Sequence, residues 1–481
     1  MNEKNKHSQP FVMVLIVTIL LLGASLVNTK INIFGFETKK AELLSDILLK
    51  REVEKDSIPV LIASDSTISK DKVKIILSSS IINSSNIIDY NNDTSSALSH
   101  FFQALNTSKK QKHKTRIAYF GDSMIEGDLI SQDLRSCMQD VFGGFGVGFV
   151  PITSIVAGFR SSVIHSFDGW TTYNLLEKPP ANHVLGISGY GFVPNTINPD
   201  DTSNTVNESW VKYVAVNKKH INKFYETKLL YGKSDDQNSV VINGSRYSLK
   251  GENTVNQIII DDPNSSQSIK ATFQCKTPMD VFGFSMESDS GVFVDNFSFR
   301  GNSGMPITKV LQSVYSGTNN CLNYDLIILE YGLNAVDPKI TDFSWYERGM
   351  NNVIKHIQAS FPNTSILLIS VGDKSYRKDG VYETDPSVPI LVETQKRMAK
   401  NNKIAFWSLY DAMGGNGSMV KWVEGDTVLA NKDYAHFNFK GAHKVGKLLF
   451  AKLMSEYKEF NNKNASSTFS FSGKGNEKLK N

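Results

Sequence analysis

The stretch from Arg116 to Phe142 constrains the fold of this chain more than any other. It begins with a short apolar run, Ile117 to Phe120, and breaks at Gly121. From Leu129 onward its apolar residues recur at helical spacing. A strand, a glycine turn and a helix in this order place Ser123 at the carboxyl end of a strand, where α/β sheets bind ligands and a helix dipole favours negative charge. Gly-Asp-Ser is also a common turn, so partners must come from the rest of the chain.

The composition limits the classes of function. With 481 residues the chain is long enough for two or three domains. Its formal net charge of +4 is small for this length and there is no basic recognition helix, so we expect no nucleic-acid partner. Cys137, Cys275 and Cys321 are too few for a disulfide framework and lack metal-ligand spacing. One bridge between Cys275 and Cys321 stays open.

The N-terminus carries an export signal. Phe11 to Val27 is a largely apolar run that would span roughly 26 Å as a helix. The basic leader, residues 1–10, predicts a cytoplasmic N-terminus and an exported remainder. We favour an uncleaved anchor because Leu26 continues the apolar run, and a signal peptide cleaved near Gly23-Ala-Ser25 is the alternative. The expected location is the cell envelope, periplasmic or extracellular, with secretion if the signal is cleaved.

The remaining sequence shows two kinds of hydrophobic pattern. Residues 94–194 and 301–460 show strand–helix alternation, which is typical of a parallel sheet covered by helices on both faces. Residues 195–300 instead contain short alternating runs separated by turns, which predict an inserted small β-sandwich. We expect residues 28–93 to form a stalk or N-terminal region and residues 461–481 a disordered tail.

Individual elements can be assigned within the second α/β part. The expected order is a strand at 325–331, a helix at 345–360, a strand at 365–371, a helix at 388–399, a strand at 404–409 and a final helix at 441–460. The glycine-rich run from Phe142 to Val150 lacks the Gly-x-Gly-x-x-Gly order of nucleotide-binding loops. We therefore expect a tightly turning loop beside the active face.

Polar residues follow two of the predicted elements. The strand ending at Tyr331 leads into Gly332 and Asn334, and an amide there can donate to a developing oxyanion or cap the next helix. Directly before the last helix, Asp433 and His436 are three residues apart, so one turn can bring the carboxylate under the imidazole. A carboxylate on Nδ1–H leaves Nε2 free to take a proton from a hydroxyl.

A fourth stretch lies where the β-rich segment returns to the α/β pattern, at Arg300-Gly-Asn-Ser-Gly304. A glycine there can let its N–H approach a ligand, although a linker turn is the simpler interpretation. Of the nine histidines, only His436 has a carboxylate at this spacing at the start of an α/β element. His443, on the final helix, is interpreted as a surface or packing residue.

Taken in order, these pieces form a set: Gly-Asp-Ser, a loop glycine, Gly-x-Asn and Asp-x-x-His. The set resembles the four blocks of the SGNH/GDSL hydrolases, over roughly residues 95–195 and 300–460. The resemblance implies a three-layer α/β/α, flavodoxin-like hydrolase domain. With the pattern above, the expected fold is this domain carrying an inserted β-sandwich and preceded by a membrane helix.

The resemblance also implies roles for single residues. Ser123 would be the nucleophile, His436 the general base and Asp433 its orienting carboxylate. The oxyanion hole would consist of the N–H groups of Ser123 and Gly304 and the amide of Asn334. Neither a metal nor an organic cofactor is implied.

The sequence departs from the family pattern in the third block. That block usually ends in Asp, and here Ala335 follows the amide, which puts the support of this loop in doubt. The glycine of the second block is ambiguous as well. Gly304 fits best because it ends Asn-Ser-Gly, while Gly301 and Gly189 are alternatives.

A finer resemblance is to bacterial envelope esterases of the peptidoglycan O-acetylesterase type. It rests on Gly-Asp-Ser-x-x-x-x-Asp, then Leu-Arg, then Phe-Gly-Gly-x-Gly-x-Gly-Phe. Those enzymes carry a β-sandwich similar to a carbohydrate-binding module. Trp170, Tyr190 and Trp210 could contact sugar, but each is better interpreted as core.

The resemblance thus implies an exported serine esterase that removes O-acetyl groups from a cell-envelope glycan such as peptidoglycan. Its partners would be the acetylated glycan and, through the N-terminal helix, the membrane. One alternative is an O-acetyltransferase with the same triad, in which a sugar hydroxyl replaces water as the acceptor. The other is a non-catalytic glycan-binding envelope protein.

Overall fold

The computed structural model describes residues 32–33, 36–37, 86–91, 96–177, 179–196 and 208–472. The chain divides into two units, Met1–Ile75 and Ile76–Asn481. In the first unit, β1 (Asn32–Ile33) and β2 (Phe36–Glu37) pair antiparallel. The predicted anchor at 11–27 lies outside the described residues. Within the ranges above, no helix has the length and apolar content needed to cross a membrane.

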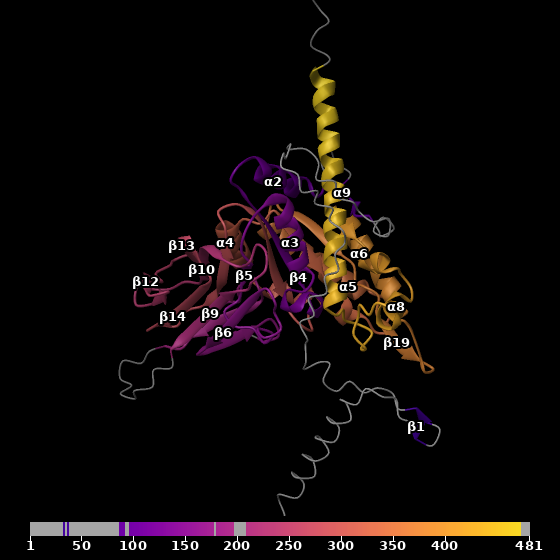
Figure 1. Ribbon diagram of the computed structural model, residues 1–481, viewed down its shortest axis with the longest axis horizontal. Helices are drawn as coiled ribbons and strands as arrows, with labels where there is room; N and C mark the ends of the chain where they lie inside the picture. The colour runs from indigo at the N-terminus through magenta and orange to yellow at the C-terminus, as the bar shows by residue number, and fades with distance from the viewer. Residues whose placement is uncertain are drawn as a thin grey trace, which may run out of the picture. The chain divides into compact units, whose positions relative to one another are not determined.

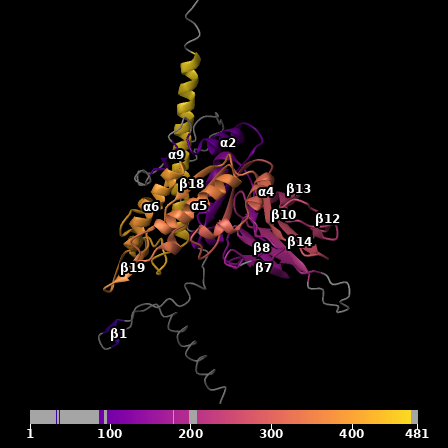
Figure 2. The same ribbon diagram turned by 180° about the vertical axis from the view of Figure 1, so that it is seen from behind.

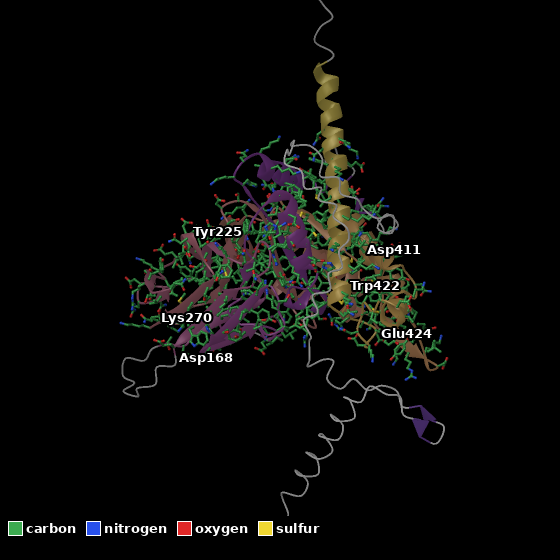
Figure 3. All side chains as sticks on the ribbon, viewed as in Figure 1. Asp168, Tyr225, Lys270, Asp411, Trp422 and Glu424 are labelled. Atoms are coloured by element: carbon green, nitrogen blue, oxygen red, sulfur yellow. The ribbon has the colours of Figure 1, made fainter. Side chains whose placement is uncertain are left out.

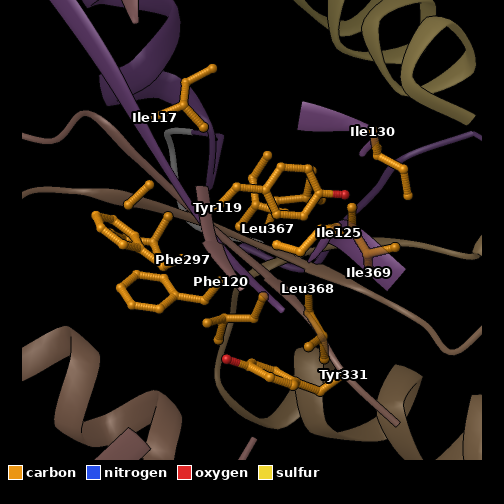
Figure 4. Close-up of a cluster of buried hydrophobic side chains, with 14 of the residues drawn as sticks. Ile117, Tyr119, Phe120, Ile125, Ile130, Phe297, Tyr331, Leu367, Leu368 and Ile369 are labelled. Carbon is orange, nitrogen blue, oxygen red and sulfur yellow. The ribbon is translucent and has the colours of Figure 1, made fainter. Parts of the chain in front are cut away.

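A six-stranded sheet lies at the centre of the second unit. Its order is β16 (Gly291–Ser298), β4 (Lys114–Gly121), β17 (Leu326–Glu330), β18 (Ser365–Ile369), β21 (Ala405–Trp407) and β3 (Ile88–Asp89). The first five strands are parallel and β3 runs antiparallel to β21. Strands such as β17 are buried along their whole length, as expected of a parallel sheet covered on both faces. Figure 4 shows part of this core, including Phe120 and Phe297, whose ring centroids lie 4.9 Å apart.

Helices cover the sheet in two groups, so the predicted mixed α/β architecture is confirmed. The first group, in front in Figure 1, is α2 (Ser99–Lys110), α3 (Ser131–Phe142) and α9 (Phe439–Ser472). The second group, in front in Figure 2, is α4 (Gln312–Leu322), α5 (Ser344–Ser360) and α6 (Ser387–Asn401). Two short helices, α7 (Leu409–Met413) and α8 (Ser418–Glu424), follow β21.

The residues between α3 and β16 form two antiparallel sheets, which we call the antiparallel region. One sheet contains β13 (Asn256–Ser266), β10 (Phe224–Tyr231), β15 (Val281–Glu287), β8 (Tyr190–Pro194), β7 (Trp170–Asn174) and, beside β15, β5 (Gly148–Val150). The other contains β12 (Ser245–Ser248), β11 (Ser239–Ile242), β14 (Ser268–Gln274), β9 (Ser209–Ala215) and β6 (Val163–Asp168). Apolar side chains of both sheets share one core cluster. Figure 3 labels Tyr225 on β10 and Lys270 on β14.

The predicted bounds of 195–300 for the β-rich insert differ from the structure at both ends. Strands β5 to β8 precede residue 195 and already belong to the antiparallel region. The last predicted strand of the insert, near 291–297, is β16, which pairs in parallel with β4. Both kinds of strand are rich in apolar residues, so local pattern does not separate them.

Two terminal boundaries also differ. Residues 86–91, predicted to be part of a stalk, instead include β3, which pairs with β21. Ile87 is buried there, and the Asp89 carboxylate accepts from the Ala97 N–H. At the other end, α9 continues to Ser472, beyond the predicted end of order at 460. A hydrogen bond from the Asn106 amide to Asn461 Oδ1 ties this extension to α2.

The glycine-rich loop does not lie beside the active face as predicted. A Cβ on Gly144 would lie 2.9 Å from the Val292 nitrogen, at the amino end of β16. At Gly148 a Cβ would lie 2.1 Å from the Asp295 carboxylate. The glycines are therefore needed because the loop passes against β16 on its way to β5.

A buried ionic network joins the antiparallel region to the parallel sheet. Arg116 on β4 is fully buried and pairs with Glu287 of β15 and, at 3.2 Å, with Asp295 of β16. Glu287 also accepts from Lys114 and Lys228, each at 2.9 Å. The Arg116 Nε donates to the Leu322 carbonyl at 3.1 Å. One guanidinium on β4 thus contacts β15, β16 and the end of α4, which lie 171, 179 and 206 residues later in the sequence.

Replacing the guanidinium should be strongly destabilising. Arg116→Met leaves two buried carboxylates short of a partner, and breaking a buried pair in this way costs about 3–5 kcal/mol. Urea unfolding monitored by tryptophan fluorescence measures the change. Lys112→Met, which removes an exposed pair with Asp289, is the matched control and should leave the midpoint almost unchanged. Equal effects of the two substitutions would contradict the role given to Arg116.

Candidate active site

Three neighbouring strands end in register at one edge of the parallel sheet. Gly121 at the end of β4 lies opposite Ser298 of β16 and Glu330 of β17. The residues that follow these strands therefore meet at the carboxyl edge, where open α/β sheets bind ligands. They include Ser123 after β4 and Asn334 after β17.

The chain turns sharply at the end of β4 and exposes one side chain. Gly121 packs so closely that a Cβ would lie 2.9 Å from Ile125. The Asp122 carboxylate accepts from the Met124 N–H at 3.0 Å and caps a 3₁₀ turn, Ser123–Asp128. Throughout the described stretch 115–131, Ser123 alone is not buried. Its hydroxyl is therefore presented to solvent from an otherwise buried corner.

The structure brings Ser123, His436 and Asp433 together. Ser123 Oγ lies 2.8 Å from His436 Nε2, and His436 Nδ1 lies 2.8 Å from Asp433 Oδ2. The other Asp433 oxygen accepts from the N–H groups of Ala435 and His436, at 3.0 and 3.1 Å. Burial acts to raise the pKa of Asp433, but the hydrogen bonds from His436 and Ala435 outweigh it and lower the pKa below its usual value. The ionised carboxylate can therefore orient the imidazole and stabilise its protonated form.

A hairpin supports the Asp-x-x-His loop from the side. Its strands are β19 (Ser375–Lys378) and β20 (Val381–Thr384), and Ser375 N–H donates to the Tyr434 carbonyl at 2.9 Å. The Tyr434 ring stacks on Tyr382 at 3.6 Å, and its hydroxyl donates to Glu424, which Figure 3 labels on α8. The sequence analysis missed this hairpin, although the Asp-Gly pair between the strands is a typical hairpin turn.

Of the predicted oxyanion-hole residues, Asn334 lies at the sheet edge but Gly304 does not reach the cavity. The Asn334 amide lies at the edge and donates to Asp122 Oδ2 and to the Asn302 carbonyl, each at 3.1 Å. These two bonds hold the Asn334 loop in place, although Ala335 stands where the family pattern usually has Asp. Gly304, in contrast, is buried and its N–H donates to Asn302 Oδ1 at 2.8 Å.

Gly301 fits the cavity better than the predicted Gly304. A Cβ on Gly304 would lie 2.7 Å from the Met350 sulfur, so that glycine serves packing. Gly301 lines the cavity beside Ser123, and its φ of 72° suits glycine. The third candidate, Gly189, borders a separate small cavity that lacks Ser123. The choice between glycines depended on packing across the sheet, which the sequence pattern does not show.

A cavity of about 570 Å³ opens over the Ser–His pair. Its lining combines the catalytic candidates with apolar and charged side chains: Ser123, Glu126, Leu129, Val156, Phe159, Arg300, Gly301, Asn334, Asn431, Asp433, His436 and Phe437. The His436 and Asp433 side chains are 38% and 48% exposed. A volume of this size accommodates a substituted sugar ring, and the exposed imidazole can reach an incoming water.

Two buried carboxyl groups near Ser123 carry raised pKa values. Burial raises the pKa of Asp122 to about 6, against opposing hydrogen bonds from Met124 and Asn334. Burial also raises the pKa of Glu330 to about 8, and its hydrogen bond from the Tyr119 hydroxyl opposes this. Asp122 is oriented toward Asn334 rather than His436, so it does not serve as the triad acid.

Glu126 and Asp128, next to the nucleophile, form ion pairs. Asp128 is buried and binds both terminal nitrogens of Arg135, at 2.7 and 2.8 Å. Burial would raise the pKa of Asp128, but Arg135 and Arg160 lower it far below its usual range. Glu126 pairs with Arg300 at the cavity wall. These pairs fix the corner that follows Ser123.

Other histidines also pair with carboxylates. Within the described ranges these pairs are His100–Asp325, His183–Asp280, His220–Asp140 and His443–Asp133. None of these imidazoles has a serine hydroxyl on its other nitrogen in the part of the chain that the structure describes. His436 is distinguished by that second contact.

The remaining predicted residues have packing roles. All three cysteines are free thiols, so the possible bridge between Cys275 and Cys321 is absent. The Trp170 indole donates to the Trp210 carbonyl, and Tyr190 stacks on Phe299 at 4.8 Å. The sugar-binding alternative for these aromatic residues therefore gains no support from their contacts.

Comparisons with known proteins agree with this fold. No protein-family model matches the sequence, and no curated protein matches it. Among solved structures, a peptidoglycan O-acetylesterase is similar, with 20% identity and a TM-score of 0.63 over 78% of this chain and 99% of that chain. At this identity the likeness confirms the predicted resemblance at the level of the fold.

Two other solved structures match more weakly. A family two carbohydrate esterase from Clostridium thermocellum, in complex with cellohexaose, has 9% identity and a TM-score of 0.26, with 61% of this chain and 98% of that chain covered. An acetyl xylan esterase has 16% identity and a TM-score of 0.24, with 33% and 79% covered. Scores this low carry no argument.

Removing the charge of the orienting carboxylate should impair proton transfer. In Asp433→Asn the replaced oxygen becomes an amide donor, which favours the wrong imidazole tautomer and lowers kcat for an acetyl ester by about 10³- to 10⁴-fold. Hydrolysis of p-nitrophenyl acetate measures this. Asp411→Asn, an exposed carboxylate on α7, is the control. A loss below tenfold would show that Asp433 does not orient the base.

Asp122 should contribute a pH-dependent term to stability. Because its folded-state pKa is raised to about 6, the folded protein binds this proton more tightly than the unfolded chain. The contribution of Asp122 to the free energy of unfolding is greatest below about pH 4. It falls by about 3 kcal/mol as the pH rises through about 6. Asp122→Asn should therefore gain stability relative to the wild type between pH 4 and pH 7 in urea unfolding. A difference that does not change with pH would contradict this.

Proposed function

We propose that this protein is a serine esterase that hydrolyses O-acetyl esters on a cell-envelope glycan such as peptidoglycan. The observation that carries the proposal is the chain of contacts from Ser123 Oγ to His436 Nε2 and from His436 Nδ1 to Asp433, at 2.8 Å each, in an open cavity. This is the arrangement that activates a hydroxyl for acyl transfer.

The reaction follows from these positions. His436 Nε2 accepts the Ser123 proton while Oγ attacks the ester carbonyl carbon, and the carbonyl oxygen becomes an oxyanion. When the tetrahedral adduct collapses, the bond to the sugar oxygen breaks and His436 returns the proton to that oxygen. Water then attacks the carbonyl carbon of the acetyl-enzyme and gives its proton to His436. When this second adduct collapses, the bond from carbon to Ser123 Oγ breaks, His436 returns the proton to Oγ and acetate leaves.

The oxyanion requires donors at the strand ends. We assign this role to the Ser123 N–H, to the N–H of Gly301 in place of Gly304, and to the Asn334 amide, which would exchange its hydrogen bond to the Asn302 carbonyl for one to the oxyanion. Gly301 and Asn334 both line the cavity beside Ser123. Removing a single oxyanion donor typically lowers kcat by 10²- to 10³-fold.

The choice of substrate rests on the fold and on the N-terminal sequence. The fold is similar to that of a peptidoglycan O-acetylesterase over 78% of this chain and 99% of that chain. The apolar run at 11–27 supports export and attachment to the membrane, which would bring the cavity to envelope polysaccharides. The substrate class is thus an acetylated glycan outside the cytoplasm.

The nucleophile can be tested directly. Ser123→Ala should abolish acetate release from O-acetylated peptidoglycan and labelling by a fluorophosphonate probe, because no other hydroxyl faces His436 among the described residues. Ser344→Ala, at the start of α5, is the matched control and should retain both. Circular dichroism checks that each variant is folded. Full activity of Ser123→Ala would overturn the proposal, and transfer of acetyl to an added glycan would favour the acetyltransferase.

A further inference from the structure

A second, smaller cavity adjoins the one above Ser123. Its volume is about 50 Å³, and Glu126 and Val156 line both cavities. The rest of its wall comes from the 151–160 loop and from strands β8 and β16, which bring in Arg160, Tyr190 and Ser298. The small cavity is therefore continuous with the active-site wall and is not used by the mechanism above.

Arg160 is a buried cation with an unused donor. Its side chain is 9% exposed. Its Nε donates to Ser162 Oγ at 2.9 Å, and one terminal nitrogen, Nη2, reaches Asp128 at 3.4 Å. The other, Nη1, donates to no group that the structure describes. Asp128 is already bound twice by Arg135 at shorter distances, so Arg160 holds only a weak share of that carboxylate.

The charges around this cavity do not balance. The buried guanidinium groups of Arg135 and Arg160 share one carboxylate, Asp128, whereas Arg300, which is 61% exposed, pairs separately with Glu126. The nearby network of Arg116, by comparison, pairs three cations with three carboxylates: Lys114, Arg116 and Lys228 with Glu226, Glu287 and Asp295. An uncompensated buried charge is costly unless a ligand or solvent compensates it. One additional negative charge would balance the cations around the small cavity.

The wall also carries a hydroxyl without a partner. Ser188 is buried and its Oγ has no hydrogen-bond partner; the residue lies between the small cavity and a neighbouring one of about 10 Å³, and lines both. Buried polar atoms are normally satisfied, so an unpaired one facing a cavity points to a ligand or a water. Thr153 and Ser298 add further hydroxyls that can donate to an anion.

We propose that the small cavity binds a carboxylate of the substrate, carried by the same sugar whose acetyl ester lies at Ser123. This deepens the proposed function and rests on it. A guanidinium with one free edge and several hydroxyls matches a carboxylate, and the net surplus is a single positive charge. A phosphate dianion would exceed that surplus and lie against Glu126 and Asp128. The enzyme would thus select acidic acetylated glycans over neutral ones.

Substrate competition tests the inference in the full-length protein. The probes are O-acetylated polygalacturonate, whose carboxylate is on the ring, O-acetylated glycan strands freed of peptide, whose carboxylate is on the lactyl ether, and O-acetylated xylan, which is neutral. We expect kcat/KM for at least one acidic glycan to exceed that for xylan by about 10-fold or more, and added salt to reduce the ratio. Whichever acidic glycan shows the preference identifies the source of the carboxylate.

Variants separate Arg160 from general charge effects. Arg160→Gln should lower the acidic-to-neutral ratio by about 10-fold, and Arg160→Lys, which keeps the charge, should restore part of it. Arg246→Gln, an exposed arginine on β12, removes the same charge and should leave the ratio unchanged. Thermal melting confirms that the variants are folded, and the wild-type ratio alone tests the inference if Arg160→Gln does not fold.

The outcomes distinguish the two proposals. Equal kcat/KM for acidic and neutral glycans in the wild type, or an unchanged ratio in folded Arg160→Gln, would overturn the carboxylate site and leave the esterase intact. Retained activity in Ser123→Ala would overturn the esterase itself. Calorimetry can test the site without turnover, by comparing Ser123→Ala with the double variant Ser123→Ala/Arg160→Gln. Tighter binding of galacturonate oligosaccharides by the single variant would support the site.

Discussion

The register of β4 between β16 and β17 is the constraint on which the site depends. Because Gly121, Ser298 and Glu330 lie side by side, the loops that follow the three strands converge within one hydrogen-bonded row. The loop with Asp433 and His436 reaches the same edge just before α9. A shift of one residue in the pairing of β4 with β17 would move Ser123 away from Asn334, so backbone pairing fixes geometry that no single side-chain contact could fix.

Buried polar groups nearer the amino end of β4 also hold this register. Arg116 enters the sheet five residues before Gly121 and links β4 to β16 through Asp295. The same guanidinium binds Glu287, so the antiparallel region is attached to β4, the strand that leads into Ser123. The two parts of the second unit therefore share buried charge in addition to apolar contacts.

The sequence was sufficient for features that depend on local order. Strand–helix alternation predicted the parallel sheet, and short motifs at strand ends predicted Ser123, Asn334, Asp433 and His436, which the structure brings to one edge. It was insufficient where contacts span long separations. Strand β16 belongs to the parallel sheet because it pairs with β4, and its Asp295 contacts Arg116, which is 179 positions away in the sequence. Gly301 and Gly304 differ only in what packs against them, which one sequence does not show.

The place of β16 at the end of its sheet has a consequence for how the protein can be divided. Its outer side is covered by the glycine-rich loop, where the Val292 N–H donates to the Gly143 carbonyl. Excising the antiparallel region would remove Glu287 and expose β16 as an edge strand beside β4, and exposed edge strands invite pairing between molecules. The β-rich part therefore covers an edge of the parallel sheet and is not a detachable accessory.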